Sequence, residues 1–471
     1  MATVVAIPGE AARGNATDTA SATWALAALA LCMLLPSLGT SIANVALPAL
    51  TGAFDATFAQ VQWVVLAYLL ANTTLIVGVG RLGDVAGRRR LLVAGIALFT
   101  TASVACALAP SLGWLIAARA LQGLGAAVLM ALSTAFAGDV VPKERTGSAM
   151  GLLGTMSAVG TALGPSLGGV LIAGPGWRTI FLINVPLGIL AFVVALRSLP
   201  ADRARRGAAG RIDATGTFVL ALTLAAYALA MTLGRGRAGA ANAALLAAAV
   251  AGLGLFVWIE MRAASPLVPL AMVRSRTLAA SLGATALVST VMMTTLVVSP
   301  FYLMRALGLG AASAGLVMSL GPIVAAMAGV PAGRLVDRLG ATRLAATGLT
   351  GIGAGCLALS LLPTTAGIAG YLAAIVTTTV GYAVFQAANT TAVLANVPPD
   401  RRGVVSGLLN LARNLGLITG ASAMGAVFAH AAGTNDVATA TPGSVAVGMR
   451  ITFAVATGVI AAAMGIARHR R

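Results

Sequence analysis

The sequence predicts an all-α integral membrane protein with fourteen transmembrane helices. These helices form two pseudo-symmetric six-helix bundles plus an inserted central helix pair. Three observations carry this prediction. The chain of 471 residues is 59% hydrophobic and only 9% charged, whereas a soluble domain carries about 25% charged residues. Long apolar blocks recur along the chain, and the octet GRLxDxxG occurs twice, at 80–87 and at 333–340.

The apolar blocks define the expected helices. A helix needs about 20 mainly apolar residues to cross a bilayer, and the connections between the blocks are short and rich in glycine and proline. The first block is too long for the apolar region of a cleavable signal, so we expect it to be retained. The fourteen blocks start near residues 23, 60, 91, 114, 148, 179, 213, 242, 277, 311, 344, 366, 404 and 446.

The basic residues set the expected orientation. With the amino terminus inside, 23 of the 30 basic residues fall in inner segments, five in outer segments and two within spans. Cytoplasmic loops carry such an excess. We therefore expect a multi-pass protein of the inner (cytoplasmic) membrane with both termini cytoplasmic. The net charge of +18 is scattered between apolar blocks, so the expected partners are the lipid bilayer and a small organic molecule, not nucleic acid. We expect a monomer.

Two internal repeats divide the chain into related halves. The octets lie 253 positions apart, and VPKERTGSAMG at 141–151 resembles VPPDRRGVVSG at 397–407 with an offset of 256. Spans 1–6 then correspond to spans 9–14, and residues 213–262 form an inserted hairpin. The predicted organisation is a cytoplasmic tail at 1–21, a first six-helix bundle at 22–198, a basic loop and inserted hairpin at 199–265, a second six-helix bundle at 266–467 and a tail at 468–471.

Several strings resemble the major facilitator superfamily and its fourteen-span drug:proton antiporter branch. GRLGDVAGRRR resembles the loop that follows the second span of the superfamily. RALQGLGAA at 119–127 resembles the arginine motif of the branch, and VGTALGPSLGG at 159–169 resembles the motif associated with antiporters. The resemblance covers nearly the whole chain. It implies two bundles that rock against each other around a central site.

The loop after the second span resembles an inner gate. A carboxylate at a helix end can bind a neighbouring helix amino terminus or an arginine across the bundle interface. A simpler interpretation is a tight turn beside a basic cluster that fixes topology. The residues expected to form the gate are Gly80, Asp84, Gly87 and Arg88, with Asp337 in the second copy.

Arg119 and Arg413 are predicted to lie inside spans. A charge within a span is costly and normally faces the protein interior. The resemblance implies that Arg119 takes part in proton coupling or substrate binding; a structural hydrogen-bond anchor is the alternative. Arg413 faces either the cavity or only the inner vestibule. The residues predicted for coupling or the substrate cavity are Arg119, Gln122, Asn44, Arg413, Gln386 and Asn389.

The fifth span carries glycines at four-residue spacing around a proline. Such a helix is smooth and bent, so it packs closely against a neighbour. The resemblance implies an antiporter hinge that also seals against proton leak, while close packing without a special role is the alternative. The residues of this motif are Gly160, Gly164, Pro165, Gly168 and Gly169.

The chain departs from the branch in the first span. The string LGTSIANVALP places Gly39 where the branch usually has an aspartate. Proton coupling then needs another group, either Asp55, Asp84 or Asp139, or a substrate that carries the proton itself. Exporters of cations commonly use a buried carboxylate to offset desolvation, so we expect neutral or anionic compounds to be preferred here.

The sequence therefore predicts a secondary active transporter that exports drugs or amphipathic organic compounds by alternating access, in exchange for protons. An importer of a small nutrient, a facilitator and a non-transporting membrane sensor are the alternatives. The chain has no phosphate-binding loop, no cluster of metal ligands and no nucleophile–base set. We thus expect no catalytic residue, no metal site and no cofactor other than an ion gradient, and we do not expect an enzyme.

Overall fold

In the residues that it describes, the computed structural model consists of helices and the short connections between them. These residues are 8–140, 146–200, 202, 214–232, 239–263, 275–394, 397, 402–433 and 440–468. Residues 1–7 and 469–471 of the predicted tails and most of the basic loop lie outside them. Thirteen helices in the described part are long and apolar enough to cross a membrane. This confirms the all-α membrane fold.

The first half of the chain forms one bundle. Short breaks at Gln62 and Ile183 divide the second and sixth predicted spans into two helices each. The helices are α1 (Pro8–Phe54), α2 (Phe58–Val61), α3 (Trp63–Ala86), α4 (Arg88–Ala107), α5 (Leu112–Val140), α6 (Thr146–Ala173), α7 (Thr179–Leu182) and α8 (Asn184–Ser198).

The inserted hairpin and the second bundle follow. The hairpin is α9 (Ala214–Thr232) and α10 (Ala240–Arg262). The second bundle consists of α12 (Arg276–Phe301), η2 (Tyr302–Ala306), α13 (Ala311–Leu339), α14 (Ala341–Leu361), η3 (Thr364–Ala366), α15 (Gly367–Leu394), α16 (Arg402–Thr419), η5 (Gly420–Met424), α17 (Gly425–Ala431) and α18 (Pro442–Arg468).

The thirteenth predicted span differs from the others. It is built from α16, the π-helical segment η5 and α17, which follow one another without a break from Arg402 to Ala431. It is the one predicted span outside the set of thirteen apolar helices. Asn410, Arg413 and Asn414 interrupt its apolar sequence, so this helix is amphipathic rather than apolar all round.

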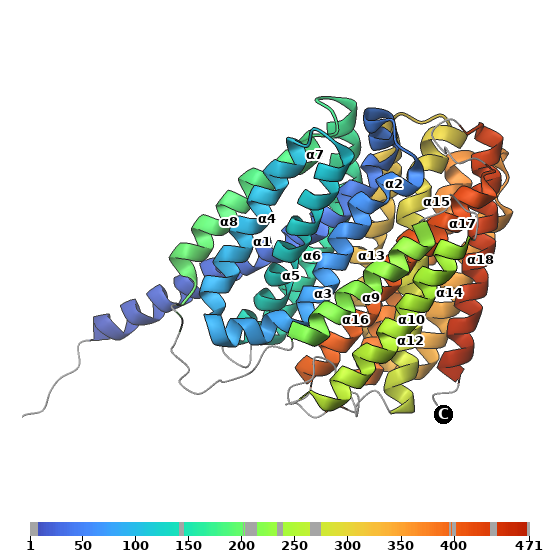
Figure 1. Cartoon of the computed structure of the whole chain (residues 1–471). Helices are drawn as coiled ribbons and strands as arrows, with labels where there is room; N and C mark the ends of the chain where they lie inside the picture. The colour runs from blue at the N-terminus through green and yellow to red at the C-terminus, as the bar shows by residue number, and fades with distance from the viewer. Residues whose placement is uncertain are drawn as a thin grey trace, which may run out of the picture.

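The two bundles repeat one packing scheme, as the sequence repeats predict. In the first bundle α1 packs on α6 and α8, α5 on α3 and α4, and α4 on α8. In the second, α12 packs on α16 and α18, α15 on α13 and α14, and α14 on α18. Both octets also end in the same backbone conformation, since Gly87 has φ 94° and Gly340 has φ 85°. Figure 1 shows the two bundles side by side.

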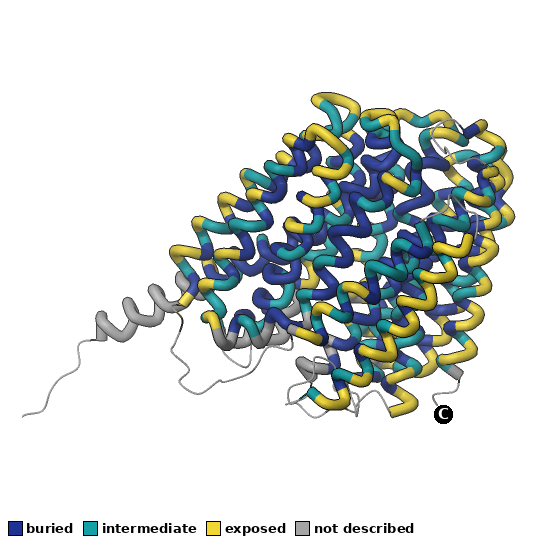
Figure 2. The backbone as a smooth tube through the Cα atoms, in the orientation of Figure 1, coloured by how far each residue is buried: buried dark blue, intermediate teal, exposed yellow. Residues whose placement is uncertain are grey.

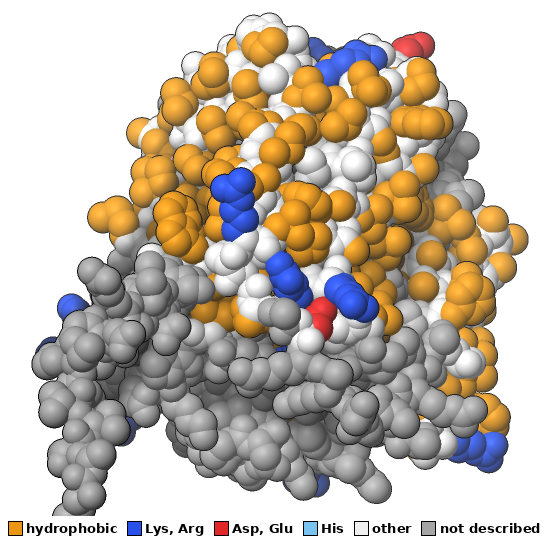
Figure 3. Space-filling model, turned by 90° about the vertical axis from the view of Figure 1, so that its left-hand side faces the viewer, with side chains coloured by type: hydrophobic (Ala, Val, Ile, Leu, Met, Phe, Trp, Pro, Cys, Tyr) orange, Lys and Arg blue, Asp and Glu red, His pale blue; other side chains and the backbone are white. Residues whose placement is uncertain are grey.

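The outer surface is apolar, as expected for a protein surrounded by lipid. Buried backbone lies in the interior of each bundle, and exposed positions follow the outside (Figure 2). Side chains such as Val250 and Met327 are 71% and 73% exposed. Figure 3 shows one broad face of the molecule covered mainly with hydrophobic side chains, with charged groups at its upper edge and above the grey atoms in its lower half.

The inserted hairpin covers one seam between the bundles. The Trp63 indole donates a hydrogen bond to the Thr232 hydroxyl at 3.1 Å, and Gly78 lies beside Thr217. Fifteen residues separate these contacts on both helices, so α9 runs antiparallel along α3. Helix α9 also contacts η5 of the second bundle, and α3 contacts α16. The hairpin therefore lies over the junction of α3 with α16 and η5.

Candidate functional site

Arg119 lies at the centre of the first bundle. It is fully buried on α5. Its Nε donates to the Val64 carbonyl at 2.9 Å and its Nη1 donates to the Gly39 carbonyl at 3.2 Å. Nη1 also donates to Oε1 of Gln122 at 2.6 Å, and Nε2 of Gln122 donates to the Ser103 hydroxyl at 2.7 Å. The network thus joins α1, α3, α4 and α5 and brings together Arg119 and Gln122, while their predicted role in coupling or substrate binding stays a prediction.

Aromatic rings surround the Arg119 guanidinium. Its central carbon lies 4.2 Å from the centroid of the Tyr68 ring and 5.9 Å from that of Phe181. Such contacts stabilise a desolvated cation. A Cβ atom at Gly39 would lie 3.3 Å from the Phe99 ring, so the position of the missing aspartate faces α4 inside the bundle. Nη2 of Arg119 has no hydrogen-bond partner among the described residues.

The predicted asparagines and glutamine lie in different bundles. Asn44 is buried on α1, where its Nδ2 donates to the Thr40 carbonyl at 2.9 Å. Its Oδ1 has no partner in the part of the chain that is described. Asn389 is buried on α15 and donates to the Thr285 hydroxyl of α12 at 2.9 Å. Gln386, one turn before Asn389 on α15, is half-buried.

Arg413 is placed differently from Arg119. It lies in the middle of α16 and is half-buried, with Asn410 exposed and Asn414 buried on the same helix. Gly416 and Gly420 of this helix approach the backbone of α12 at Ala286 and Thr290. Contacts in the second bundle therefore fix the helix, while Arg413 remains partly accessible.

Helix α6 has two glycine faces. On the first face, a Cβ atom at Gly160 would meet the Leu34 backbone, and one at Gly164 would lie 2.5 Å from the Ser41 side chain. Gly168 continues this face against Ile42. The Ser41 hydroxyl donates to the Thr161 carbonyl at 2.8 Å. This face joins α6 to α1 within the first bundle.

The second face of α6 joins the two bundles. A Cβ atom at Gly169 would lie 2.5 Å from the Ala311 carbonyl oxygen and 3.0 Å from Gly315, both on α13. A Cβ atom at Gly315 would in turn meet the Pro165 carbonyl. Backbones approach this closely only where both helices carry small residues. The antiporter-like motif therefore contributes directly to the contact between the halves.

Three phenylalanines lie together at the end of the molecule that also holds the Gly169–Gly315 contact. This end lies away from the Arg88–Arg90 cluster, and we call it the opposite end. The ring centroid of Phe58 is 4.9 Å from that of Phe301 and 5.9 Å from that of Phe428. Phe301 and Phe428 are 6.0 Å apart. Since Phe58 belongs to the first bundle and the other two to the second, this aromatic cluster closes the seam.

A buried hydrogen bond crosses the seam beside the aromatic cluster. Nε2 of Gln62 donates to the Ala421 carbonyl at 2.8 Å, and Gln62 is only 2% exposed. Ala421 lies within the π-helical segment η5, where the regular i to i+4 bonding is interrupted and functional contacts are frequent. A Cβ atom at Gly425 would overlap the Gln62 amide, so this glycine leaves room for the contact.

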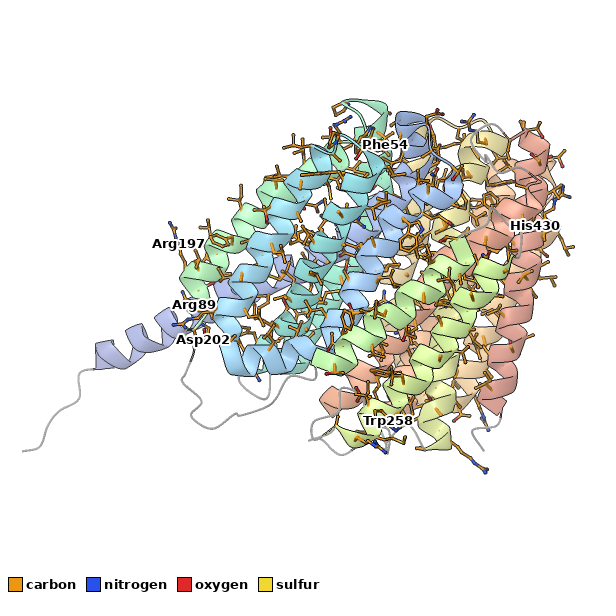
Figure 4. The ribbon with its side chains drawn as sticks, in the orientation of Figure 1. Phe54, Arg89, Arg197, Asp202, Trp258 and His430 are labelled. Atoms are coloured by element: carbon orange, nitrogen blue, oxygen red, sulfur yellow. The ribbon has the colours of Figure 1, made fainter. Side chains whose placement is uncertain are left out.

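The basic end is the end at which α3 finishes and α4 begins, and it is organised by Asp202. The carboxylate of Asp202 accepts hydrogen bonds from the backbone N–H groups of Arg89 at 2.7 Å and Arg90 at 3.2 Å. The Arg89 guanidinium donates to the Leu196 carbonyl. A Cβ atom at Gly87 would lie 2.5 Å from the Asp202 carboxylate. Figure 4 shows Arg89 and Asp202 together, far from Phe54 at the opposite end.

The sequence singled out other residues of the basic end. The structure does not describe the side chains of Asp84 and Asp337 or the surroundings of Gly80 in α3, so their predicted gating role stays a prediction. Arg88 is half-buried at the start of α4. Asp202 was missed, although an acidic residue directly after a span and within a basic segment was a usable signal.

Comparison with known proteins agrees with this architecture. The family model described as Major Facilitator Superfamily matches residues 29–421. The chain belongs to the Major Facilitator Superfamily. It is 32% identical to the uncharacterized transporter YebQ of Escherichia coli (strain K12), over 81% of this chain and 84% of that protein. It is 31% identical to the multidrug resistance protein Stp of Mycobacterium tuberculosis, over 86% of this chain and 75% of that protein.

A solved structure of the superfamily shares the fold. The crystal structure of a bacterial homologue of the human lysosomal transporter Spinster, in an inward-facing and occupied conformation, has a TM-score of 0.70. It is 18% identical in sequence and covers 95% of this chain and 96% of that one. The chain is thus a superfamily transporter whose two bundles meet through α6 with α13 and through α3 with α16.

Proposed function

We propose that the protein is a secondary active transporter that exports amphipathic organic compounds by alternating access, in exchange for protons. Neutral and anionic compounds are its preferred substrates. It lies as a monomer in the cytoplasmic membrane, with the basic end and both termini inside. The similarity to a multidrug resistance protein supports the direction of transport.

The proposed substrate class rests on the charged side chains found in the interior of the two bundles. The described acidic side chains are Asp55, Asp202 and Glu260, and each lies at or beyond a helix end. Both arginines predicted within spans lie inside helices, Arg119 in α5 and Arg413 in α16. A permanent cation meets no described carboxylate within the spans of the two six-helix bundles to offset its desolvation, whereas an anion meets the half-buried Arg413 and a neutral compound has a smaller desolvation cost.

Three contacts support the alternating-access cycle. The aromatic cluster, the Gln62 hydrogen bond and the Gly169–Gly315 approach hold the bundles together at the opposite end. In the proposed cycle these contacts break when the transporter opens outward. The gating loop around Asp84 then closes the basic end.

Uptake into proteoliposomes tests the proposal. The purified transporter is reconstituted into liposomes and a neutral lipophilic dye is added. A pH gradient is then imposed across the liposome membrane in either direction. We expect dye movement to reverse with the gradient and Asp84→Asn to abolish it. In cells that lack their own efflux pumps, expression is expected to raise tolerance of neutral and acidic compounds more than of quaternary ammonium compounds. Transport that ignores the pH gradient, or best protection against quaternary ammonium compounds, would contradict the proposal.

A further inference from the structure

The two arginines within spans have different surroundings. Arg119 is fully buried in the first bundle, and two of its nitrogens make three hydrogen bonds to groups of the protein itself. It has no exposed surface for a ligand. Arg413 is half-buried, and within the described residues no hydrogen bond or ion pair to a protein group is found for its guanidinium.

The helix that carries Arg413 is suited to line an aqueous path. It is the one predicted span that falls outside the thirteen apolar helices. Gly416 and Gly420 fix the side of the helix that faces α12. With about 100° of rotation per residue, Arg413 stands about 60° and Asn410 about 120° around the helix from Gly416. An arginine facing hydrocarbon is costly, so this polar face belongs to the space between the bundles.

The depth of Arg413 also fits a substrate site. It lies eleven residues from Arg402, the first residue of α16, or about 16 Å along the helix axis. Gly416 lies beside Ala286 and Gly420 beside Thr290, so α16 and α12 run parallel in register. This register places Arg413 near the depth of Thr285, which binds the buried Asn389.

We propose that Arg413 binds the carboxylate or sulfonate group of acidic substrates, and that Arg119 does not. This inference rests on the proposed transport of neutral and anionic compounds. It assigns the recognition of the anionic group to one residue. The planar guanidinium binds a carboxylate through two parallel hydrogen bonds. Asn410, exposed one turn before Arg413, adds an amide donor beside it.

A matched pair of ligands tests the assignment. Pyrenebutyric acid and its methyl ester share one fluorescent apolar body and differ only in charge. Binding of each is measured by fluorescence to the full-length protein in nanodiscs of phosphatidylcholine, so that no anionic lipid competes. We expect the wild type to prefer the acid, and Arg413→Gln to weaken acid binding about tenfold or more, the size expected for a charged hydrogen bond. Ester binding stays unchanged and reports that the variant is folded.

Two further variants sharpen the test. Arg413→Lys is expected to keep part of the preference for the acid because it keeps the charge. Arg305→Gln removes an exposed arginine of the same bundle and is expected to behave as the wild type. Equal affinity of the wild type for acid and ester, no binding of the acid, or parallel loss of both ligands in Arg413→Gln would overturn the assignment.

The outcome is separable from that of the proposed function. If Arg413→Gln binds acid and ester alike but still exports a neutral dye when a pH gradient drives transport, both proposals stand. If the wild type binds the acid through Arg413 but moves no dye, only the export proposal fails. Addition of phosphatidylglycerol to the nanodiscs distinguishes a lipid phosphate from a soluble anion as the bound group. Displacement of the acid by this lipid at equal molar amounts would overturn the substrate role.

Discussion

At the scale of single residues, one side chain type performs two tasks in this molecule. Arg119 uses its hydrogen bonds to connect α5 with α1 and α3 and, through Gln122, with α4, and Tyr68 covers its guanidinium. Arg413 is half-buried on an amphipathic helix at the seam. The two arginines differ in their hydrogen-bond partners and not in their position within a span. The sequence reveals only the position, so both were predicted as cavity residues.

Replacement of Arg119 is expected to destabilise the first bundle. Arg119→Ala removes the side-chain donor to the carbonyls of Val64 and Gly39 and to the amide oxygen of Gln122 inside the bundle. We expect a loss of roughly 3 kcal/mol or more in the free energy of unfolding, since hydrogen bonds to charged groups contribute about 1.5–3 kcal/mol each. Denaturation of the protein in detergent measures this. Arg413→Ala is the control, and an equal loss in both variants would contradict the distinction.

Asp202 gives a second prediction at this scale. Its carboxylate caps α4 by accepting the N–H groups of Arg89 and Arg90. Asp202→Ala is expected to destabilise the first turn of α4 by about 0.5–2 kcal/mol, the usual value for a lost helix cap. Hydrogen exchange should then accelerate at the amides of Arg89 and Arg90 but not at the far end of α4. Asp202→Asn keeps one acceptor and should lie between the two.

At the scale of elements, the octet repeat places the same backbone conformation in both bundles. Gly87 and Gly340 each connect two helices with a positive φ. A side chain at either site is strained by about 1 kcal/mol. At Gly87 a Cβ atom also meets Asp202, whereas nothing lies within 4 Å of one at Gly340. We expect Gly87→Ala to lower thermal stability clearly more than Gly340→Ala. Equal effects would show that the Asp202 contact adds nothing.

Helix α6 gives the next prediction. Gly169 touches the backbone of α13 in the other bundle, whereas Gly154 on the same helix has open space at its Cβ position. Gly169→Ala is therefore expected to push the bundles apart at the opposite end and to lower transport several-fold with little loss of folding. Gly154→Ala should leave the transport rate within about twofold, as surface changes cost roughly 0.5 kcal/mol or less. If both variants transport alike, the glycine contact is not part of the cycle.

The elements also show how far the sequence could be interpreted. Apolar length and the two repeats were enough for the fold, because a bilayer leaves only helices as spans of this composition. Glycine spacing in α6 predicted close packing, but it did not say that Gly160 and Gly169 face different partners. The π-helical segment Gly420–Met424 had no sequence signal, since it depends on contacts between distant helices.

At the scale of the whole molecule, the closed seam at the opposite end defines the state of the transporter. The contacts across this seam come from α2 and the Gln62 break on one side and from α12, η5 and α17 on the other. Residues more than two hundred positions apart form them, so no local pattern predicts them. The hairpin covers the seam of α3 with α16, while α6 with α13 and α1 with α12 form further contacts between the bundles.

The Gln62 hydrogen bond offers a direct test of this state. Removal of a buried hydrogen bond changes an equilibrium by about 0.5–1.5 kcal/mol, or roughly 2- to 12-fold. Gln62→Ala is therefore expected to raise the population in which the opposite end is open. Spin labels at Gly52→Cys in the first bundle and Gly310→Cys in the second measure the separation of the halves there. Both positions have open space for a side chain, and the native cysteines are buried.

The matched control for this measurement is Gln60→Ala. Gln60 is the same residue type two positions earlier, but within the described part of the chain its side chain bonds only to Thr57 of its own turn. We expect Gln62→Ala to shift the distance distribution to longer values and Gln60→Ala to leave it unchanged. The distance should shorten again when the labelled Gln62→Ala variant is held by a ligand that binds from the basic end, because a ligand favours the state that it fits. An unchanged distribution in Gln62→Ala would mean that the aromatic cluster and the glycine contact hold the seam without this hydrogen bond.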